Sequence, residues 1–263
     1  MMFLLLLAQS IIAPPAPNVP PTPALPSAAI ETVEAHYDRC VDLATADPAR
    51  GVIEATAWHS NGGGFISRQC LGIAHANQQD WSAAAQQFTM AAQEAEVAHD
   101  ARAAHYWAQA GNAWIAAGEP AKARAALDAA LAAGTLEGLQ RGEAQFDRGR
   151  ALVATGDLES ARADVDRALE LAGGDPLIWL ASAALARRMD DLPRARKDIA
   201  QAFRLSSDDP SVYLEIGNIA AFGGDEAGAK SAWSDAIRVA PSSPAAASAR
   251  KALQQFETDP PKP

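Results

Sequence analysis

The chain has 263 residues, 49% of them apolar, which is enough to bury the core of one or two domains. Acidic residues outnumber basic ones by 32 to 22, so the net charge is −10 at neutral pH. An acidic chain without a basic block is a poor partner for nucleic acid or for an anionic membrane surface, and we expect neither. Helix-favouring alanine, leucine, glutamate and arginine outnumber β-branched residues, which predicts an all-α protein.

The N-terminal segment differs from the rest of the chain, because residues 1–30 contain no charged side chain. The apolar run over residues 1–13 is shorter than the about 20 residues that span a membrane, so no stable transmembrane anchor is expected. It is typical of the apolar region of a secretory signal peptide. The basic residues that normally precede this region are absent, and a misassigned start codon would explain their absence. Export to the periplasm or cell surface is predicted, with a disordered N-terminal arm as the alternative. Residues 14–30 are proline-rich and predict an extended linker.

A pattern of four residues recurs along the rest of the chain. In the alanine-rich stretch GNAWIAAGEPAKARAALDAALAAG, residues 111–134, it consists of Gly111, Ala123, Leu127 and Ala130. The third residue of each copy is large and apolar, the other three are small, and successive copies are 34 to 39 residues apart. The other copies are Gly72, Ala84, Phe88 and Ala91; Gly149, Ala161, Val165 and Ala168; Ala183, Ala195, Ile199 and Ala202; and Gly217, Ala229, Trp233 and Ala236.

Each copy predicts two helices joined by a short turn, because a turn signal such as Gly156-Asp157 separates its first residue from the others. We expect the Gly or Ala of the first helix to face the small Ala of the second, with the large residue in the groove beside them. A glycine inside a helix costs about 0.5–1 kcal/mol relative to alanine, so its repeated use needs a packing reason. One hairpin cannot bury its apolar face alone, whereas stacked hairpins can.

The pattern resembles the tetratricopeptide repeat. Aromatic residues four positions before the opening small residue, namely Trp107, Trp179 and Tyr213, add to the resemblance, and the fourth copy departs from it by having Ala183 in place of Gly. The resemblance implies a right-handed α-solenoid of stacked helix-turn-helix hairpins that presents a groove to a protein or peptide partner. The five repeat units are residues 65–98, 104–137, 142–175, 176–209 and 210–243.

Both ends of the repeat array are predicted to be closed by helices that differ from the repeat. Residues 31–64 predict a divergent N-terminal capping hairpin whose second helix runs to about Ser60. Residues 244–257 predict a C-terminal capping helix, because their apolar residues fall on one face. Residues 258–263 predict a flexible tail.

The two cysteines, Cys40 and Cys70, are expected on apolar faces of different helices in the N-terminal region. If the chain is exported, a disulfide between them is the natural interpretation, whereas in a reducing cytoplasm they would remain buried free thiols. His36 lies one turn from Cys40, and His75 follows Cys70. The irregular spacing of these four residues does not favour a zinc site, and neither a metal nor a cofactor is expected.

The first helices of such a solenoid line a concave surface on which a partner would bind. Asn112 and Asn218 match an Asn of the clamps with which the family holds a peptide carboxylate, but the Lys residues of such a clamp are absent. Arg150 and Arg187 are cations in an acidic protein, so they would either pair with a carboxylate-bearing partner or remain solvated. The candidate binding residues are His105, Asn112, Phe146, Arg150, Arg187 and Asn218.

The sequence contains no catalytic motif of the H-E-x-x-H, G-x-S-x-G or Walker type. We therefore predict that the protein is not an enzyme but a scaffold or adaptor that binds a protein or peptide in the cell envelope. A cytoplasmic adaptor with the same fold is the first alternative. An envelope glycan-binding module, or an enzyme whose site is improvised on the helical scaffold, is a further alternative.

Overall fold

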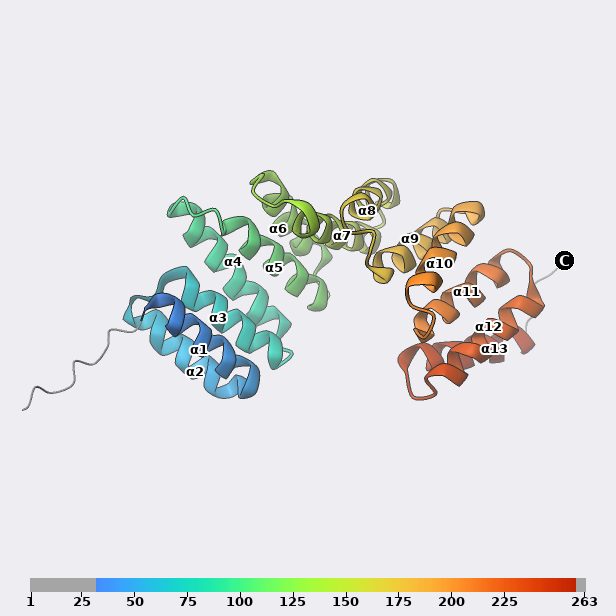
Figure 1. Ribbon diagram of the computed structural model, residues 1–263, viewed down its shortest axis with the longest axis horizontal. Coiled ribbons are helices and arrows are strands. Elements are labelled where there is room, and N and C mark those ends of the chain that lie inside the picture. Colours follow the sequence, from blue (N-terminus) through green and yellow to red (C-terminus); the bar gives the residue numbers. More distant parts are fainter. Residues whose placement is uncertain (1–31, 259–263) are drawn as a thin grey trace, which may run out of the picture. The chain divides into compact units, whose positions relative to one another are not determined.

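The structure is a computed structural model that describes residues 32–258. Over this range thirteen α-helices follow one another as antiparallel hairpins, and no strand occurs among these residues (Figure 1). The prediction of an all-α fold of stacked helical hairpins is thus confirmed. The expected signal segment 1–13, the linker 14–30 and residues 259–263 of the predicted tail lie outside the described residues.

Five hairpins, each with a first and a second helix, form the body of the fold. They are preceded by α1 (Val33–Ala46) and α2 (Pro48–Trp58) and followed by α13 (Pro244–Thr258). The first helices are α3 (Gly64–Asn77), α5 (Ala103–Ala116), α7 (Gly138–Thr155), α9 (Pro176–Arg188) and α11 (Pro210–Phe222). The second helices are α4 (Trp81–Val97), α6 (Pro120–Ala132), α8 (Leu158–Ala172), α10 (Leu192–Leu205) and α12 (Glu226–Val239).

Aspartate side chains start most of these helices. The carboxylate of Asp157 accepts a hydrogen bond from the Ser160 amide at the start of α8, and α4, α10 and α12 begin in the same way. Before α9 and α11, Asp175 and Asp209 cap the helix while a proline occupies its first turn. Because a capping Asp satisfies an amide that the helix leaves unpaired, these turns are fixed by local sequence.

The hairpins stack so that each second helix packs on the first helix of its own hairpin and on that of the next. First helices also contact one another directly, α5 with α7 and α9 with α11, whereas α7 and α9 approach less closely. Small side chains fill the helix interfaces, which explains the alanine-rich composition. Each second helix has completely buried alanines, among them Ala84, Ala123, Ala161, Ala195 and Ala229.

In the first helices, Gly72, Gly111 and Gly217 face the large residue of the second helix more closely than its small alanine. A Cβ added to Gly111 would lie closer than 3 Å to the side chain of Leu127, and one added to Gly217 would lie equally close to the Trp233 ring. Our expectation that Gly would oppose the small Ala was therefore wrong. The glycine makes room for the large side chain, which occupies the space where a Cβ would be.

The N-terminal capping hairpin is less regular than the repeats. Its second helix ends at Trp58, slightly before the predicted end at Ser60. A wide turn, η1 (His59–Gly63), follows, and within it Asn61 and Gly62 leave helical geometry. Gly62 has a φ of 92°, which a residue with a side chain rarely adopts, so the break occurs where glycine allows it.

A disulfide fastens this capping hairpin to the first repeat. It joins Cys40 in α1 to Cys70 in α3, with their Cα atoms 6.2 Å apart and both residues completely buried. Within the hairpin, Gly51 of α2 lies so close to the backbone of Ala44 in α1 that a Cβ would displace it. Both contacts hold α1 and α2 against their neighbours.

Candidate functional site

Two cavities open on the side of the fold formed by the first helices, one on each side of α7. The cavity between α5 and α7, which we call the α5–α7 pocket, has a volume of about 300 Å³. The cavity between α7 and α9, the α7–α9 pocket, has a volume of about 200 Å³. The first is lined by His105, Ala108, Gln109, Asn112, Leu136, Gln140, Glu143, Ala144 and Asp147, and the second by Phe146, Gly149, Arg150, Val153, Val165, Ala181, Ala184, Leu185 and Arg188.

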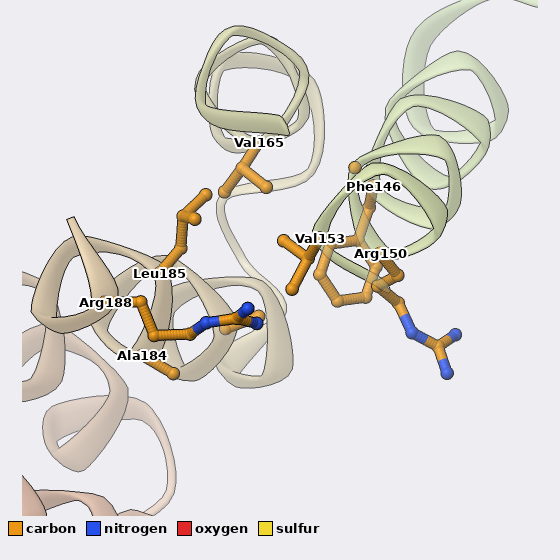
Figure 2. Close-up of a pocket in the computed structure, with 9 residues that line it drawn as sticks. Phe146, Arg150, Val153, Val165, Ala184, Leu185 and Arg188 are labelled. Carbon is orange, nitrogen blue, oxygen red and sulfur yellow. The ribbon is translucent and has the colours of Figure 1, made fainter. Parts of the chain in front are cut away.

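The α7–α9 pocket has apolar walls. Phe146 and Val153 form its α7 side, Leu185 and Ala184 form its α9 side, and Val165 of α8 lies between them (Figure 2). The pocket exists because α7 and α9 pack less closely than α5 and α7 do. It therefore offers an exposed apolar depression between these two first helices.

Two arginines lie at the mouth of this pocket, and they differ in their partners. Arg150 is bound to Asp147, with Nη1 2.9 Å from Oδ1, and its guanidinium lies beyond Phe146, directed away from the pocket (Figure 2). Arg188 extends from α9 toward Val153 (Figure 2). Its exposed side chain has neither an ion pair nor a hydrogen bond among the described residues.

The α5–α7 pocket is polar and acidic. The Asn112 side chain donates a hydrogen bond to Oδ2 of Asp147 at 2.8 Å, which connects the two helices. Asp147 is thereby held between Asn112 and Arg150. Glu143, one turn earlier on α7, is exposed and has no ion pair or hydrogen bond within the described part of the chain. Its carboxylate is thus available to a bound cation.

The structure brings together four of the six candidate binding residues, because His105, Asn112, Phe146 and Arg150 line the two pockets. The other two, Arg187 and Asn218, lie apart from these pockets, beside Glu215 of α11. The Arg187 guanidinium is 2.7 Å from Glu215, and Asn218 donates a hydrogen bond to the same carboxylate at 2.9 Å.

For Arg150 and Arg187 the sequence left open a carboxylate of the partner or solvent, and each has a carboxylate within the chain instead. Sequence reasoning missed the two unpaired charges, Arg188 and Glu143. Arg188 follows Arg187 directly, and only the rotation of α9 decides which of the two contacts α11. Neighbouring side chains on a helix point about 100° apart, so only one of these two arginines can face α11. No sequence signal shows which one it is.

The histidines and cysteines considered for a zinc site serve other contacts. Cys40 and Cys70 are bonded to each other, His36 stacks on Trp58 at 4.2 Å between ring centres, and His75 lies 3.9 Å from Asp80. Within residues 32–258 no group of three or more His, Cys, Asp or Glu side chains is placed to hold a metal ion.

The side formed by the second helices carries ion pairs within hairpins and between them. The Arg148 guanidinium binds both carboxylate oxygens of Asp164 at 2.6 and 2.7 Å, and this hydrogen bonding raises the pKa of Arg148. Arg194 bridges Asp166 at 2.6 Å and the buried Asp198 at 2.9 Å. These cations are neutralised within the chain.

Stacked helical hairpins with a groove on the first-helix side define an α-solenoid of the kind that binds other chains. A family model of the tetratricopeptide repeat matches residues 142–185, which begin in α7 and end in α9. Residues 142–185 thus match the tetratricopeptide repeat that the internal pattern of the chain predicted. No curated protein matches it in sequence. No helix within residues 32–258 is both long and apolar enough to cross a membrane.

Several solved structures are similar to this chain in fold. PilW, described as a widely conserved type IV pilus biogenesis factor, has a TM-score of 0.67 at 17% identity, over 81% of this chain and 97% of its own. PilF of Pseudomonas aeruginosa has a TM-score of 0.65 at 15% identity, over 86% and 98%. YrrB, described as a TPR protein with an unusual peptide-binding site, has a TM-score of 0.55 at 20% identity, over 74% and 96%. At these identities the likeness concerns the fold.

Proposed function

We propose that the protein is a non-enzymatic scaffold that binds a peptide segment of a partner protein across α7, on the side formed by the first helices. The observation that carries this proposal is the α7–α9 pocket, an apolar depression walled by Phe146, Val153 and Leu185. Tetratricopeptide-repeat proteins bind proteins or peptides, and the peptide-binding site of YrrB is an example within the same fold.

The dimensions of the pocket favour a side chain over a small-molecule substrate. Sites for small ligands typically have volumes of about 300–1,000 Å³ and enclose most of the ligand. The α7–α9 pocket, at about 200 Å³, is smaller and opens onto the surface. One bulky apolar side chain of an extended peptide fits this description, and burying it contributes about 1.5–3 kcal/mol to binding.

The contacts of potential catalytic groups also favour a scaffold. His59 contacts a serine hydroxyl, with Nδ1 3.0 Å from Oγ of Ser67, which is the geometry of a nucleophile and its base. Ser67 is completely buried, however, and its hydroxyl donates to the Gly64 carbonyl at 2.6 Å. A substrate cannot reach it, so this pair stabilises the turn after α2.

We also propose that the protein is exported to the cell envelope. Two features support export: the uncharged apolar run over residues 1–13, and the Cys40–Cys70 disulfide, which persists in oxidising compartments. Thiols are to be counted in denatured protein purified from its native host without reductant. Export predicts none, whereas two free thiols would place the chain in the cytoplasm.

Photo-crosslinking in the native host tests the binding proposal. A photoreactive amino acid at Ala184, in the α7–α9 pocket, is compared with the same residue at Ala163, which is exposed on α8 outside that pocket. The proposal predicts that a defined partner protein is captured from position 184 and not from position 163. Capture of the same partner from 163 alone would move binding to the second-helix side.

A further inference from the structure

Two unpaired charges of opposite sign lie on either side of α7. Glu143 lines the α5–α7 pocket and Arg188 lines the α7–α9 pocket, and both side chains are exposed. Within the described residues neither has an ion pair or hydrogen bond, whereas their charged neighbours Asp147, Arg150 and Arg187 are all paired. The groove therefore presents one free carboxylate and one free guanidinium to a bound chain.

An extended peptide can cross α7 from one pocket to the other within a few residues. An α-helix with its side chains is about 10 Å across, and an extended chain advances about 3.3 Å per residue. A strand lying across α7 thus needs about three residues to pass from one pocket to the other. Arg188 also lies at the mouth of the apolar pocket, so the acidic residue that meets it neighbours the residue that enters the pocket.

We propose that the occupant is an internal, extended segment of a partner protein with three features. A bulky aliphatic residue enters the α7–α9 pocket, an adjacent Asp or Glu pairs with Arg188, and a Lys or Arg about three residues away pairs with Glu143. This deepens the proposed function and depends on it. The segment is internal because the peptide chain continues over α7 into the α5–α7 pocket. The guanidinium of Arg188 can bind the carboxylate side chain of the peptide through two parallel hydrogen bonds.

The second-helix side does not offer the same recognition. Its cavity between α6 and α8 has the cations Arg124, Arg148 and Arg167, but each lies within 4 Å of Asp128 or Asp164. A peptide carboxylate there would have to displace an existing partner. Among the described residues that line this cavity, no charged side chain is left unpaired as Glu143 and Arg188 are.

Fluorescence anisotropy with labelled peptides and the full-length protein tests the inference. The peptide core is Lys-Ala-Ala-Leu-Glu, acetylated and amidated so that it has no terminal charge, and it is made in both chain directions. A second pair of peptides exchanges the Lys and the Glu. The inference predicts that one direction of the first pair binds, and that exchanging its charges weakens binding at least tenfold, since it turns two attractions into two repulsions.

Charge reversals in the protein provide the reciprocal test. Glu143→Lys and Arg188→Glu should each weaken binding of the preferred peptide about fivefold, and the double variant should prefer the charge-exchanged peptide. Both residues are exposed, so the variants should keep the wild-type melting temperature, which serves as the folding control. Ala184→Met, which fills the apolar pocket, should weaken binding at least tenfold, while Ala163→Met on α8 should not.

The outcomes separate this inference from the proposed function. If no peptide binds, or if affinity does not depend on the order of charges, the inference is overturned. If Ala184→Met nevertheless weakens binding, peptide docking in the pocket stands without the charge rule. If Ala184→Met has no effect on a peptide that binds, docking at this pocket is overturned as well.

Discussion

The N-terminal helices and the central helices of this protein are held together by different chemistry. From α1 to α6 the contacts are largely alanine and aromatic, with a disulfide at the start, and the helices of this region pack extensively. From α7 to α10 the contacts between hairpins are looser, and buried carboxylates within the hairpins pair with arginine. Close packing by small side chains leaves little space between helices, whereas the wider central interfaces accommodate both long ion pairs and the α7–α9 pocket.

The central network shows how long side chains replace close packing. Asp198 of α10, only 1% exposed, accepts hydrogen bonds from Ser182 at 2.5 Å and from Arg194 at 2.9 Å. Arg162 of α8 donates to the same serine at 2.9 Å and to Asp166 at 2.7 Å. Two hairpins are thereby joined through one serine. These pairs define the separation of α8 and α9, and they therefore help to fix the width of the groove between the first helices.

Removing the disulfide should produce the largest loss of stability in the N-terminal region. The bond spans 30 residues, and the chain-entropy model gives about 3–4 kcal/mol for a loop of this length. Replacing both Cys40 and Cys70 by alanine should lower the free energy of unfolding by this amount, measured by urea denaturation without reductant. Reductant should destabilise the wild type and leave the double variant unchanged. Equal stability of wild type and variant would show that the bond contributes nothing.

Breaking the central network should cost somewhat less. Asp198→Ala removes the acceptor of Ser182 and one partner of Arg194, which retains Asp166, so we expect a loss of about 2–3 kcal/mol. The matched control is Asp235→Ala, which removes an exposed pair with Arg238 and should change stability by less than about 1 kcal/mol. Equal effects of the two variants in thermal unfolding would mean that the network does not hold the central hairpins.

Glycine substitutions should distinguish the two regions more finely. Gly111→Ala forces a Cβ against Leu127 at under 3 Å, so it should cost about 1–3 kcal/mol. At Gly149 in α7 the nearest atom, in Val165, is 3.0 Å away, and the preference of helices for alanine offsets the contact. Gly149→Ala should therefore stay within about 0.5 kcal/mol of wild type.

The control for this pair is Gly174→Ala, because a Cβ there meets no atom within 4 Å. Differential scanning calorimetry of the three variants measures the differences. If Gly149→Ala destabilises the protein as much as Gly111→Ala does, the central hairpins are packed as closely as those near the N-terminus, and the contrast between the regions fails.

The substitution with the smallest expected effect on stability at neutral pH is that of Tyr106 in α5, because its effect on the free energy of unfolding depends on pH only under alkaline conditions. Burial raises the pKa of Tyr106 to about 12 from an ordinary value of 10.0. Since the folded state holds this proton more tightly, its contribution to stability is complete below pH 10 and is lost as the pH rises from 10 to about 12. Tyr106→Phe should flatten this part of the stability profile, and an unchanged profile would contradict the assignment.

Periodicity made the hairpins predictable, because recurring small residues at fixed spacing identify packing positions without any long-range information. Spacing alone did not reveal what those positions face, so Gly111 was paired with Ala123 when its neighbour is Leu127. The direction of a side chain in the second helix depends on the crossing of two helices, which a one-dimensional pattern does not contain.

The groove was predicted in part for the same reason. His105, Asn112, Phe146 and Arg150 line the two pockets on the first-helix side, since first-helix positions follow from the repeat. The internal partners of the charged residues were not predictable, because the ion pair of Arg187 joins residues on separate hairpins. Which charges remain unpaired is therefore a property of the folded stack.

Hydrogen–deuterium exchange of the full chain with and without its captured partner tests the central claim most directly. If the side formed by the first helices is the docking surface, binding should slow amide exchange in residues 138–155 and 176–188, which form α7 and α9. Exchange in residues 120–132 and 192–205, which form the second helices α6 and α10, should stay unchanged. Protection confined to those second helices would contradict the account.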